Sequence, residues 1–260
     1  MESQERILLE DVFGLTLTDV CGGALEKMSP SDKQKFAILK ARLQKGEPVQ
    51  YVTGKAPFCG RFFHVGPGVL IPRPETEELV EKILPIAARF SHRCRILDIG
   101  TGSGCIAITL ALTDNDVTAW DISDDALKIA KDNAERIGAT VIFEKKDILQ
   151  NQNSMPAELW DIIVSNPPYI CKKEAADMES NVFDHEPHEA LFVPDDQPLL
   201  FYDAIAHYGI NSLKDGGMLA FEINPLYAEG ITHLLTNNGY HDIEVHQDSF
   251  GKERFIFCYK

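Results

Sequence analysis

The tetrapeptide Asn166-Pro167-Pro168-Tyr169 is the segment of this sequence whose residue types point most directly to chemistry. It follows the apolar run 160–164. A residue before proline is kept out of the helical region, so Asn166 and Pro167 are predicted to be extended. Neither proline has an N–H group, so the segment offers hydrogen-bond acceptors with few competing donors.

Such a stiff loop can point the Asn166 side-chain oxygen and a main-chain carbonyl at one spot, with the flat ring of Tyr169 beside them. Two acceptors and a stacking face suit a planar NH2 group, as in an amide or an exocyclic amine. A hydroxyl or a phosphate does not fit such a site. The alternative is an ordinary turn after a strand, because asparagine and proline are common turn residues.

A glycine-rich segment precedes a predicted helix, and its residues are Asp98-Ile99-Gly100-Thr101-Gly102-Ser103-Gly104. Glycines between a strand and a helix let the backbone turn tightly and approach a ligand closely. The G-x-G-x-G spacing differs from the G-x-G-x-x-G spacing of dinucleotide sites, which argues against a nicotinamide or flavin cofactor. The segment alone is a weak signal, since many tight strand–helix turns share it.

Acidic residues follow the next two predicted strands. Asp121 ends the second strand, where a carboxylate can accept hydrogen bonds from both hydroxyls of a ribose. Asp147 follows the third strand and is placed to accept from an adenine amino group, with Ile148 or Leu149 covering the adenine face. Each aspartate could instead cap the helix that follows it, although Ser123 can cap the first of those helices by itself.

Ligands of open α/β sheets bind beyond the carboxyl ends of the strands. Four predicted strand ends carry, in sequence order, the glycine-rich segment, Asp121, Asp147 and Asn166. This order predicts a nucleoside-type cofactor that lies across the sheet, next to an acceptor site for an NH2 group. The nearby acidic residues suit a cationic sulfonium cofactor better than a pyrophosphate.

The pattern from Cys94 onward predicts an α/β fold with a doubly wound, mostly parallel seven-stranded sheet. The predicted strands are Arg95–Ile99, Val117–Asp121, Val141–Lys145, Asp161–Ser165, Met218–Ile223, Ile243–His246 and Arg254–Tyr259. The predicted helices are Gly104–Leu112, Asp124–Ile137, Leu199–Leu213 and Leu226–Asn237. The last two strands leave no room for a helix between them, so they are predicted to pair antiparallel. The acidic stretch 170–197 is predicted to be a substrate-facing flap rather than core.

Three parts are predicted along the chain. Residues 1–56 form a small helical domain, in which Ser29 caps a helix that starts at Pro30. Residues 57–72 are rich in aromatic, branched and glycine residues, which indicates a linking β-hairpin. Residues 73–260 form the α/β domain, whose first helix has Pro74 at its start.

The charge balance argues against a general nucleic-acid binder. The 260 residues include 25 basic and 40 acidic side chains, and the resulting net charge of −15 fits a basic partner better. No apolar run approaches the roughly 18–20 residues that cross a bilayer, so no membrane association is expected. None of the six cysteines stands in a C-x-x-C pair, which indicates a reducing cytoplasm, no disulfide framework and no metal site.

The chain resembles the class I S-adenosylmethionine-dependent methyltransferases, which have a Rossmann-like fold, and specifically the HemK/PrmC protein-glutamine methyltransferases. The resemblance runs nearly end to end and includes the helical N-terminal part. Its most specific stretch, absent from other Asn-Pro-Pro-Tyr methyltransferases, is Ile71-Pro72-Arg73-Pro74-Glu75-Thr76-Glu77. Further matches are Tyr51, Gly54, Phe58, Glu186-Pro187 and Ala190-Leu191.

The resemblance implies a role for each candidate site residue. The methionine part of S-adenosylmethionine would contact Gly100, Thr101, Gly102, Ser103 and Gly104. Asp121 would hold the ribose, and Asp147 with Ile148 would hold the adenine. The substrate glutamine would be bound by Asn166, Pro167, Pro168 and Tyr169. Asn166 would also lie against the cofactor. Two departures from the family pattern stand out. Family members often have an aromatic residue at Ile148, and a glycine after the acid of the strand that here reads Glu222-Ile223-Asn224-Pro225.

The family's reaction is methylation of the glutamine in the Gly-Gly-Gln motif of peptide chain release factors, so a release factor is the implied partner. The hypothesis for catalysis is that the Asn166 oxygen and the Pro167 carbonyl accept the two amide hydrogens, while Tyr169 holds the amide plane. The helical domain 1–56 would dock the protein substrate.

Two alternatives are open. The closest is an adenine-N6 methyltransferase of DNA or RNA, whose target presents the same planar NH2 group. Such an enzyme should carry a basic groove or a recognition domain, whereas this chain is strongly acidic. The other is a cofactor-binding regulator without chemistry, against which the intact acceptor pair argues.

Overall fold

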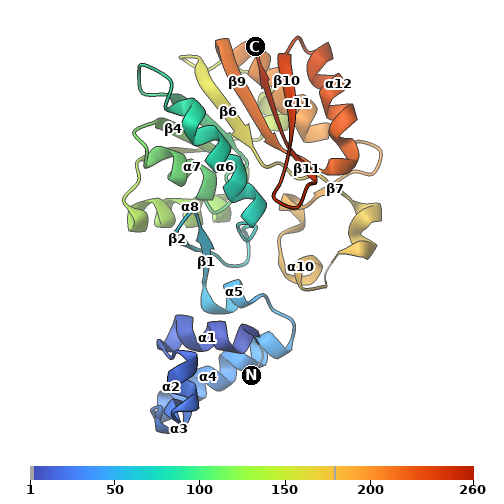
Figure 1. The fold of residues 1–260 in the computed structure, drawn as a ribbon. Helices are drawn as coiled ribbons and strands as arrows, with labels where there is room; N and C mark the ends of the chain where they lie inside the picture. The colour runs from blue at the N-terminus through green and yellow to red at the C-terminus, as the bar shows by residue number, and fades with distance from the viewer. Residues whose placement is uncertain (1–2, 179) are drawn as a thin grey trace.

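The N-terminal part of the chain is a group of helices, as predicted (Figure 1). The computed structural model describes residues 3–178 and 180–260; the remaining residues fall within the predicted helical domain and flap and lie outside the description. The helices are α1 (Ser3–Phe13), α2 (Leu17–Cys21), α3 (Ala24–Lys27), α4 (Pro30–Gln44) and α5 (Val49–Thr53). The Ser29 side chain accepts from the Asp32 N–H (3.1 Å) and caps α4, with Pro30 at its first position, as predicted.

Packing between α1 and α4 forms the small core of this helical unit. Leu8 and Leu9 are fully buried, and the rings of Phe13 and Phe36 meet edge to face with their centroids 5.9 Å apart. The Tyr51 hydroxyl at the end of the unit donates to a carbonyl of the following linker, that of Val69 (2.5 Å). Burial raises the pKa of Tyr51, so this hydroxyl keeps its proton and remains a donor.

A β-hairpin follows the helices, but it is shorter and earlier than the predicted 57–72. It consists of β1 (Lys55–Phe58) and β2 (Arg61–His64), and the chain beyond it to Arg73 is irregular. Cys59 and Gly60 both have positive φ, the geometry of a tight two-residue hairpin turn. Asn133 of the α/β domain accepts from the His64 N–H (2.6 Å) and donates to its carbonyl (2.9 Å), which fixes β2 on that domain.

The α/β domain is built on a seven-stranded sheet with the order β10-β11-β9-β6-β3-β4-β5, in which only the pairs of β11 are antiparallel. Its strands are β3 (Arg95–Ile99), β4 (Asp116–Asp121), β5 (Val141–Lys145), β6 (Trp160–Ser165), β9 (Leu213–Glu222), β10 (His241–Gln247) and β11 (Glu253–Tyr259). Every predicted strand occurs, and the predicted antiparallel ending is confirmed. The one large difference in bounds is the start of β9, predicted at Met218.

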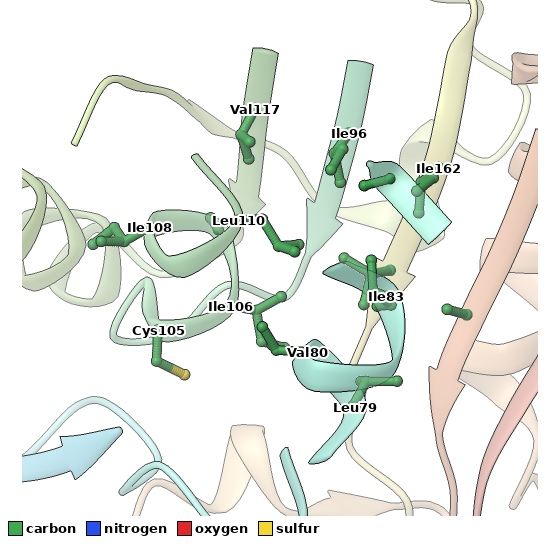
Figure 2. Close-up of a cluster of buried hydrophobic side chains, with 14 of the residues drawn as sticks. Leu79, Val80, Ile83, Ile96, Cys105, Ile106, Ile108, Leu110, Val117 and Ile162 are labelled. Atoms are coloured by element: carbon green, nitrogen blue, oxygen red, sulfur yellow. The ribbon is translucent and has the colours of Figure 1, made fainter. Parts of the chain in front are cut away.

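Helices cover both faces of the sheet, as a doubly wound fold requires (Figure 1). They are α6 (Pro74–Ala87), α7 (Cys105–Ala111), α8 (Asp124–Ile137), α9 (Ile148–Asn151), α11 (Leu200–Ser212) and α12 (Ala228–Asn237), with the 3-10 turn η3 (Pro225–Tyr227) before the last. Successive strand residues face opposite layers. Ile96 therefore packs with α6 and α7, as Figure 2 shows, whereas Leu97 belongs to the core beneath α11 and α12.

The stretch 170–197 is more ordered than the predicted flap. It contains β7 (Ile170–Cys171), η1 (Lys172–Asp177), α10 (Ser180–His185), η2 (His188–Ala190) and β8 (Phe192–Val193), and β7 pairs with β8 in parallel. Cys171, Leu191 and Val193 are buried. The prediction that this stretch lies outside the core is therefore wrong for these residues, since apolar side chains spaced along it reach the domain. None of the helices in the described ranges is long and apolar enough to cross a membrane.

The contact of α6 with the sheet provides a test of the fold. Ile83 is fully buried between α6, β3 and β6 (Figure 2), and Ile83→Ala should lower the free energy of unfolding by about 2–5 kcal/mol through lost burial and an unfilled cavity. Ile38 of α4 is 57% exposed, and Ile38→Ala is the matched control, expected to change stability by less than about 0.5 kcal/mol. Urea unfolding of the full chain measures both; equal losses would contradict this packing.

Candidate functional site

The predicted site residues meet at one edge of the sheet, where parallel strands end. Along the strand order, Asp147 follows β5, Asp121 ends β4, the glycine-rich segment follows β3 and Asn166 follows β6. Glu222, which ends β9, comes next along the same edge. The sheet thus arranges the residues in a row, with Asn166 between the glycine-rich segment and Glu222.

The glycine-rich segment has the geometry of a ligand-binding turn. Gly100, Gly102 and Gly104 all have positive φ, and the N–H groups of Gly100 and Thr101 donate to the Trp120 carbonyl (2.9 and 3.0 Å). A Cβ atom on Gly104 would lie 2.9 Å from Ile108 Cδ1, so this glycine is needed for packing. A Cβ atom on Gly100 or Gly102 would meet no described atom within 4 Å, so both glycines present bare backbone to open space.

Asp98 supports this turn from inside the sheet. Its Oδ2 accepts from the Thr101 hydroxyl (2.6 Å) and from the Ala107 N–H (3.2 Å). Burial raises the pKa of Asp98 to about 7. Among the described residues, Asp98 Oδ1 and Ser103 Oγ are buried without a hydrogen-bond partner. Polar groups of a bound cofactor or ordered water can satisfy such atoms, so the segment retains hydrogen-bonding capacity for a polar ligand.

Asp121 binds the glycine-rich segment directly. Its Oδ2 accepts from the Gly102 N–H (2.9 Å), and its Oδ1 accepts from the Ser123 N–H (2.9 Å). The cap of α8 is Ser123, whose hydroxyl accepts from the Ala126 N–H (3.2 Å), so Asp121 is not needed as a cap. Burial raises the pKa of Asp121. Its predicted contact with a ribose stays a prediction.

Asp147 does cap a helix, which was the alternative interpretation of this residue. Its Oδ1 accepts from the Leu149 N–H (2.9 Å) at the start of α9. Ile148 is buried in the core cluster that contains Trp120. The predicted contacts of Asp147 and Ile148 with adenine stay predictions, and a capping aspartate retains a second oxygen for another donor.

Asn166, Pro167 and Tyr169 line a cavity of about 90 Å³, whereas Pro168 is not among its lining residues. Asn166 Nδ2 donates to the Thr76 hydroxyl (3.1 Å), and the Tyr169 hydroxyl donates to Glu222 Oε1 (3.1 Å). In the described part of the chain, no group donates to Asn166 Oδ1 or to the Pro167 carbonyl. The remaining lining side chains are Leu70, Arg73, Ile170, Val182, Ala190, Leu191 and Glu222. A cavity of this size has room for one small planar group.

The sequence did not single out Thr76 or Glu222 as site residues. The Thr76 hydroxyl donates to Glu222 Oε2 (2.6 Å), although the two residues are 146 positions apart in the sequence. An acidic residue at the last position of an apolar strand was the available signal for Glu222. Asn224 explains part of the departure in the same stretch: its Nδ2 donates to the Tyr169 carbonyl (3.3 Å) and to Glu174 (3.0 Å).

A buried carboxylate joins the wall of the cavity to the linker. Glu186 is 3% exposed, and it accepts from the Ile71 N–H (3.0 Å) and from Arg73 (2.5 Å). Arg73 itself lines the cavity. The stretch 170–197 therefore lines the cavity and is held there by an ion pair and a backbone hydrogen bond, while its predicted role of facing the substrate stays a prediction.

Known proteins resemble this chain along nearly its whole length. Residues 2–54 match the PrmC N-terminal domain family, and residues 76–191 match the methyltransferase small domain family. A release factor glutamine methyltransferase of Bacteroides thetaiotaomicron is 47% identical over 248 residues, which is 95% of this chain and 88% of that protein. Its counterpart in Flavobacterium psychrophilum is 38% identical, with 98% and 90% covered.

Solved structures with lower identity share the fold. A methyltransferase from Pyrococcus furiosus has a TM-score of 0.54 at 17% identity and covers 85% of this chain and 97% of its own. A 16S rRNA methyltransferase of Thermus thermophilus, solved with AdoMet and guanosine, has a TM-score of 0.58 at 18% identity and covers 79% and 49%. Both confirm the predicted methyltransferase-type α/β fold.

The buried Asp98 carboxyl predicts a pH-dependent stability. Its folded pKa of about 7 lies above that of an unfolded aspartate, about 3.9, so its contribution to stability is lost as the pH rises between these values. The asparagine of Asp98→Asn stays neutral at every pH. The free energy of unfolding of this variant, relative to that of the wild type, should therefore increase between about pH 5 and about pH 8. Urea titrations at both pH values measure the difference, with the exposed Asp196→Asn as control. An unchanged difference would contradict a protonated Asp98.

Proposed function

This chain belongs to the family of release factor glutamine methyltransferases, and from this membership we propose that it methylates the side-chain amide nitrogen of the glutamine in the Gly-Gly-Gln motif of peptide chain release factors. The methyl donor is S-adenosylmethionine. The observation that carries the proposal is the cavity lined by Asn166, Pro167 and Tyr169, together with the lack of any described donor to Asn166 Oδ1 or to the Pro167 carbonyl.

The residues of the glycine-rich segment and of the next strand ends would hold the cofactor. S-adenosylmethionine supplies an electrophilic methyl group on a positively charged sulfur. Bare backbone at Gly100 and Gly102 allows close approach of its methionine part, while Asp121 would hold the ribose and Asp147 with Ile148 the adenine. Asp121 and Glu222 also place negative potential at this edge of the sheet, which favours a cation.

The acceptor pair would orient the substrate amide. A glutamine amide nitrogen is a poor nucleophile because its lone pair is delocalised into the carbonyl. Asn166 Oδ1 and the Pro167 carbonyl would each accept one of its hydrogens, which fixes the nitrogen in line with the methyl group and stabilises positive charge that develops there. The methylated nitrogen then loses its proton readily to water, so no side chain has to remove it first. Tyr169 would hold the amide plane and exclude water.

The helical unit 1–56 would dock the protein substrate. It stands apart from the sheet and joins it through the hairpin and the Tyr51 contact, so it extends the surface beyond the cavity (Figure 1). The net charge of −15 suits a basic docking face on the partner. We place the protein in the cytoplasm, where release factors act and where the six unpaired cysteines stay reduced.

Methyl transfer to defined acceptors tests the proposal. Labelled S-adenosylmethionine is incubated with a release factor, with its Gln→Ala variant at Gly-Gly-Gln, and with unmethylated DNA. We expect label on the release factor alone. Label on DNA would favour the adenine-N6 alternative, and equal label on the Gln→Ala variant would contradict glutamine as the acceptor.

Asn166→Ala tests the acceptor role directly. Loss of one positioned hydrogen-bond group should lower kcat on the order of 100- to 1,000-fold, while the Kd for S-adenosylmethionine changes by no more than about three-fold. Asn211→Ala, at an exposed position of α11, is the matched control and should match the wild type. A rate assay beside isothermal titration measures both quantities. Near-normal turnover by Asn166→Ala would contradict the proposed role of Asn166 as an acceptor for the substrate amide.

A further inference from the structure

A buried hydrogen-bond chain runs along the wall of the acceptor cavity. Asn166 Nδ2 donates to the Thr76 hydroxyl (3.1 Å), and that hydroxyl donates to Glu222 Oε2 (2.6 Å). Thr76 is 3% exposed and Glu222 is 1% exposed. Tyr169 donates to the other carboxylate oxygen of Glu222 (3.1 Å), so both oxygens have a donor. The chain links α6, the end of β6 and the end of β9.

Counting donors and acceptors fixes the direction of this chain. A threonine hydroxyl has one hydrogen, and an ionised carboxylate can only accept. Thr76 therefore spends its hydrogen on Glu222 and can only accept from Asn166. The Asn166 NH2 group must then face Thr76, and the Asn166 oxygen must face away from it, toward the cavity that Asn166 lines.

Several groups around Glu222 support its role as an acceptor. Burial raises the pKa of Glu222, and Glu75 of α6 acts in the same direction. Hydrogen bonds from Thr76 and Tyr169 and the positive charge of Arg254 on β11 act in the opposite direction. These hydrogen bonds and Arg254 favour the ionised form but do not outweigh burial, so the pKa of Glu222 remains raised. The acceptor role of Glu222 therefore rests on the geometry, in which Thr76 and Tyr169 each donate to one of its oxygens.

We propose that Thr76 and Glu222 are positioning residues that hold the Asn166 amide with its oxygen toward the substrate, and that this orientation makes the site select glutamine over glutamate. The proposal rests on the proposed function, because it assigns the origin of substrate choice to that reaction's acceptor pair. Thr76 contacts Asn166 directly, and Glu222 acts on Asn166 through Thr76.

The selectivity follows from the near-identical shape of the two ends of an asparagine amide. An oxygen toward the cavity accepts from a glutamine NH2 group and repels a glutamate carboxylate. An NH2 group in the same place would do the reverse, because it opposes the substrate's own donors and attracts a carboxylate. A site that hydrogen-bonds its substrate rejects analogues that leave its polar groups unpaired. The Thr76 hydroxyl is the group that decides between the two orientations.

The hydroxyl of Thr76 can be removed with little change in side-chain shape, so a test can separate the effect of the hydroxyl from that of packing. Thr76→Val removes the hydroxyl, and Thr76→Ser keeps it. Thr118→Val, at a buried threonine in β4, is the matched control away from Asn166. Three quantities are measured: kcat and KM with a release factor, the Kd for S-adenosylmethionine, and the Ki of the same release factor with its acceptor glutamine replaced by glutamate.

Thr76→Val is expected to lower kcat by about ten-fold or more while the cofactor Kd stays within about three-fold. The ratio of the glutamate-form Ki to the glutamine-form KM should fall by about five-fold or more, because the released amide can turn its NH2 group to the carboxylate. Thr76→Ser should recover most of the rate and the wild-type ratio, and Thr118→Val should change neither. A lower rate with an unchanged ratio would overturn the proposal in favour of a purely structural role.

Glu222→Gln provides a second variant if Thr76→Val does not fold. A glutamine there can donate to Thr76, which frees the Thr76 hydrogen for Asn166 and favours the reversed amide, so the same fall in the ratio is expected. Wild-type rate and ratio in both variants would overturn the proposal and leave the proposed function intact. Failure of the wild-type protein to label any release factor would contradict the proposed function itself.

Discussion

Parallel pairing of β3 with β4 on one side and with β6 on the other is the constraint from which the site follows. Strands that run in the same direction end at the same edge, so residues far apart in the sequence become neighbours without any local signal between them. The backbone that leaves each strand must then turn away from the sheet, and those turns are where side chains can converge. Asn166 owes its place to this geometry, since β6 lies between β3 and β9.

Two buried acidic side chains hold this edge of the sheet in place through their hydrogen bonds. Asp98 and Glu222 both stand in strands and are almost wholly buried, which is costly for an ionisable group. Each offsets that cost with hydrogen bonds: Asp98 from the glycine-rich segment and α7, Glu222 from Thr76 and Tyr169. These hydrogen bonds hold the adjoining loops in fixed positions. A cavity that selects its substrate by the direction of hydrogen bonds requires walls whose donors and acceptors stay in place.

Local patterns sufficed for most of the fold. Runs of apolar residues predict the strands from Arg95 to Tyr259 and their helices, and Ser29 predicts the start of its helix because serine is a common N-cap residue. The start of β9 was missed because residues 214–217 include paired glycines and read as a turn, although the strand continues through them. The hairpin was predicted in the right region but with the wrong bounds, because its turn lies at Cys59 and Gly60 and the glycines farther along belong to an irregular segment.

The site was predictable only to the extent that its residues stand at strand ends. Pairings across the fold leave no periodic signal, so Thr76 with Glu222, and Glu186 with Arg73, were out of reach. These pairings also unite the cavity walls, which come from the linker, from the end of β6 and from the stretch 170–197. If the substrate amide binds in this cavity as proposed, the hydrogen bonds that hold these walls together also set the shape of its binding site.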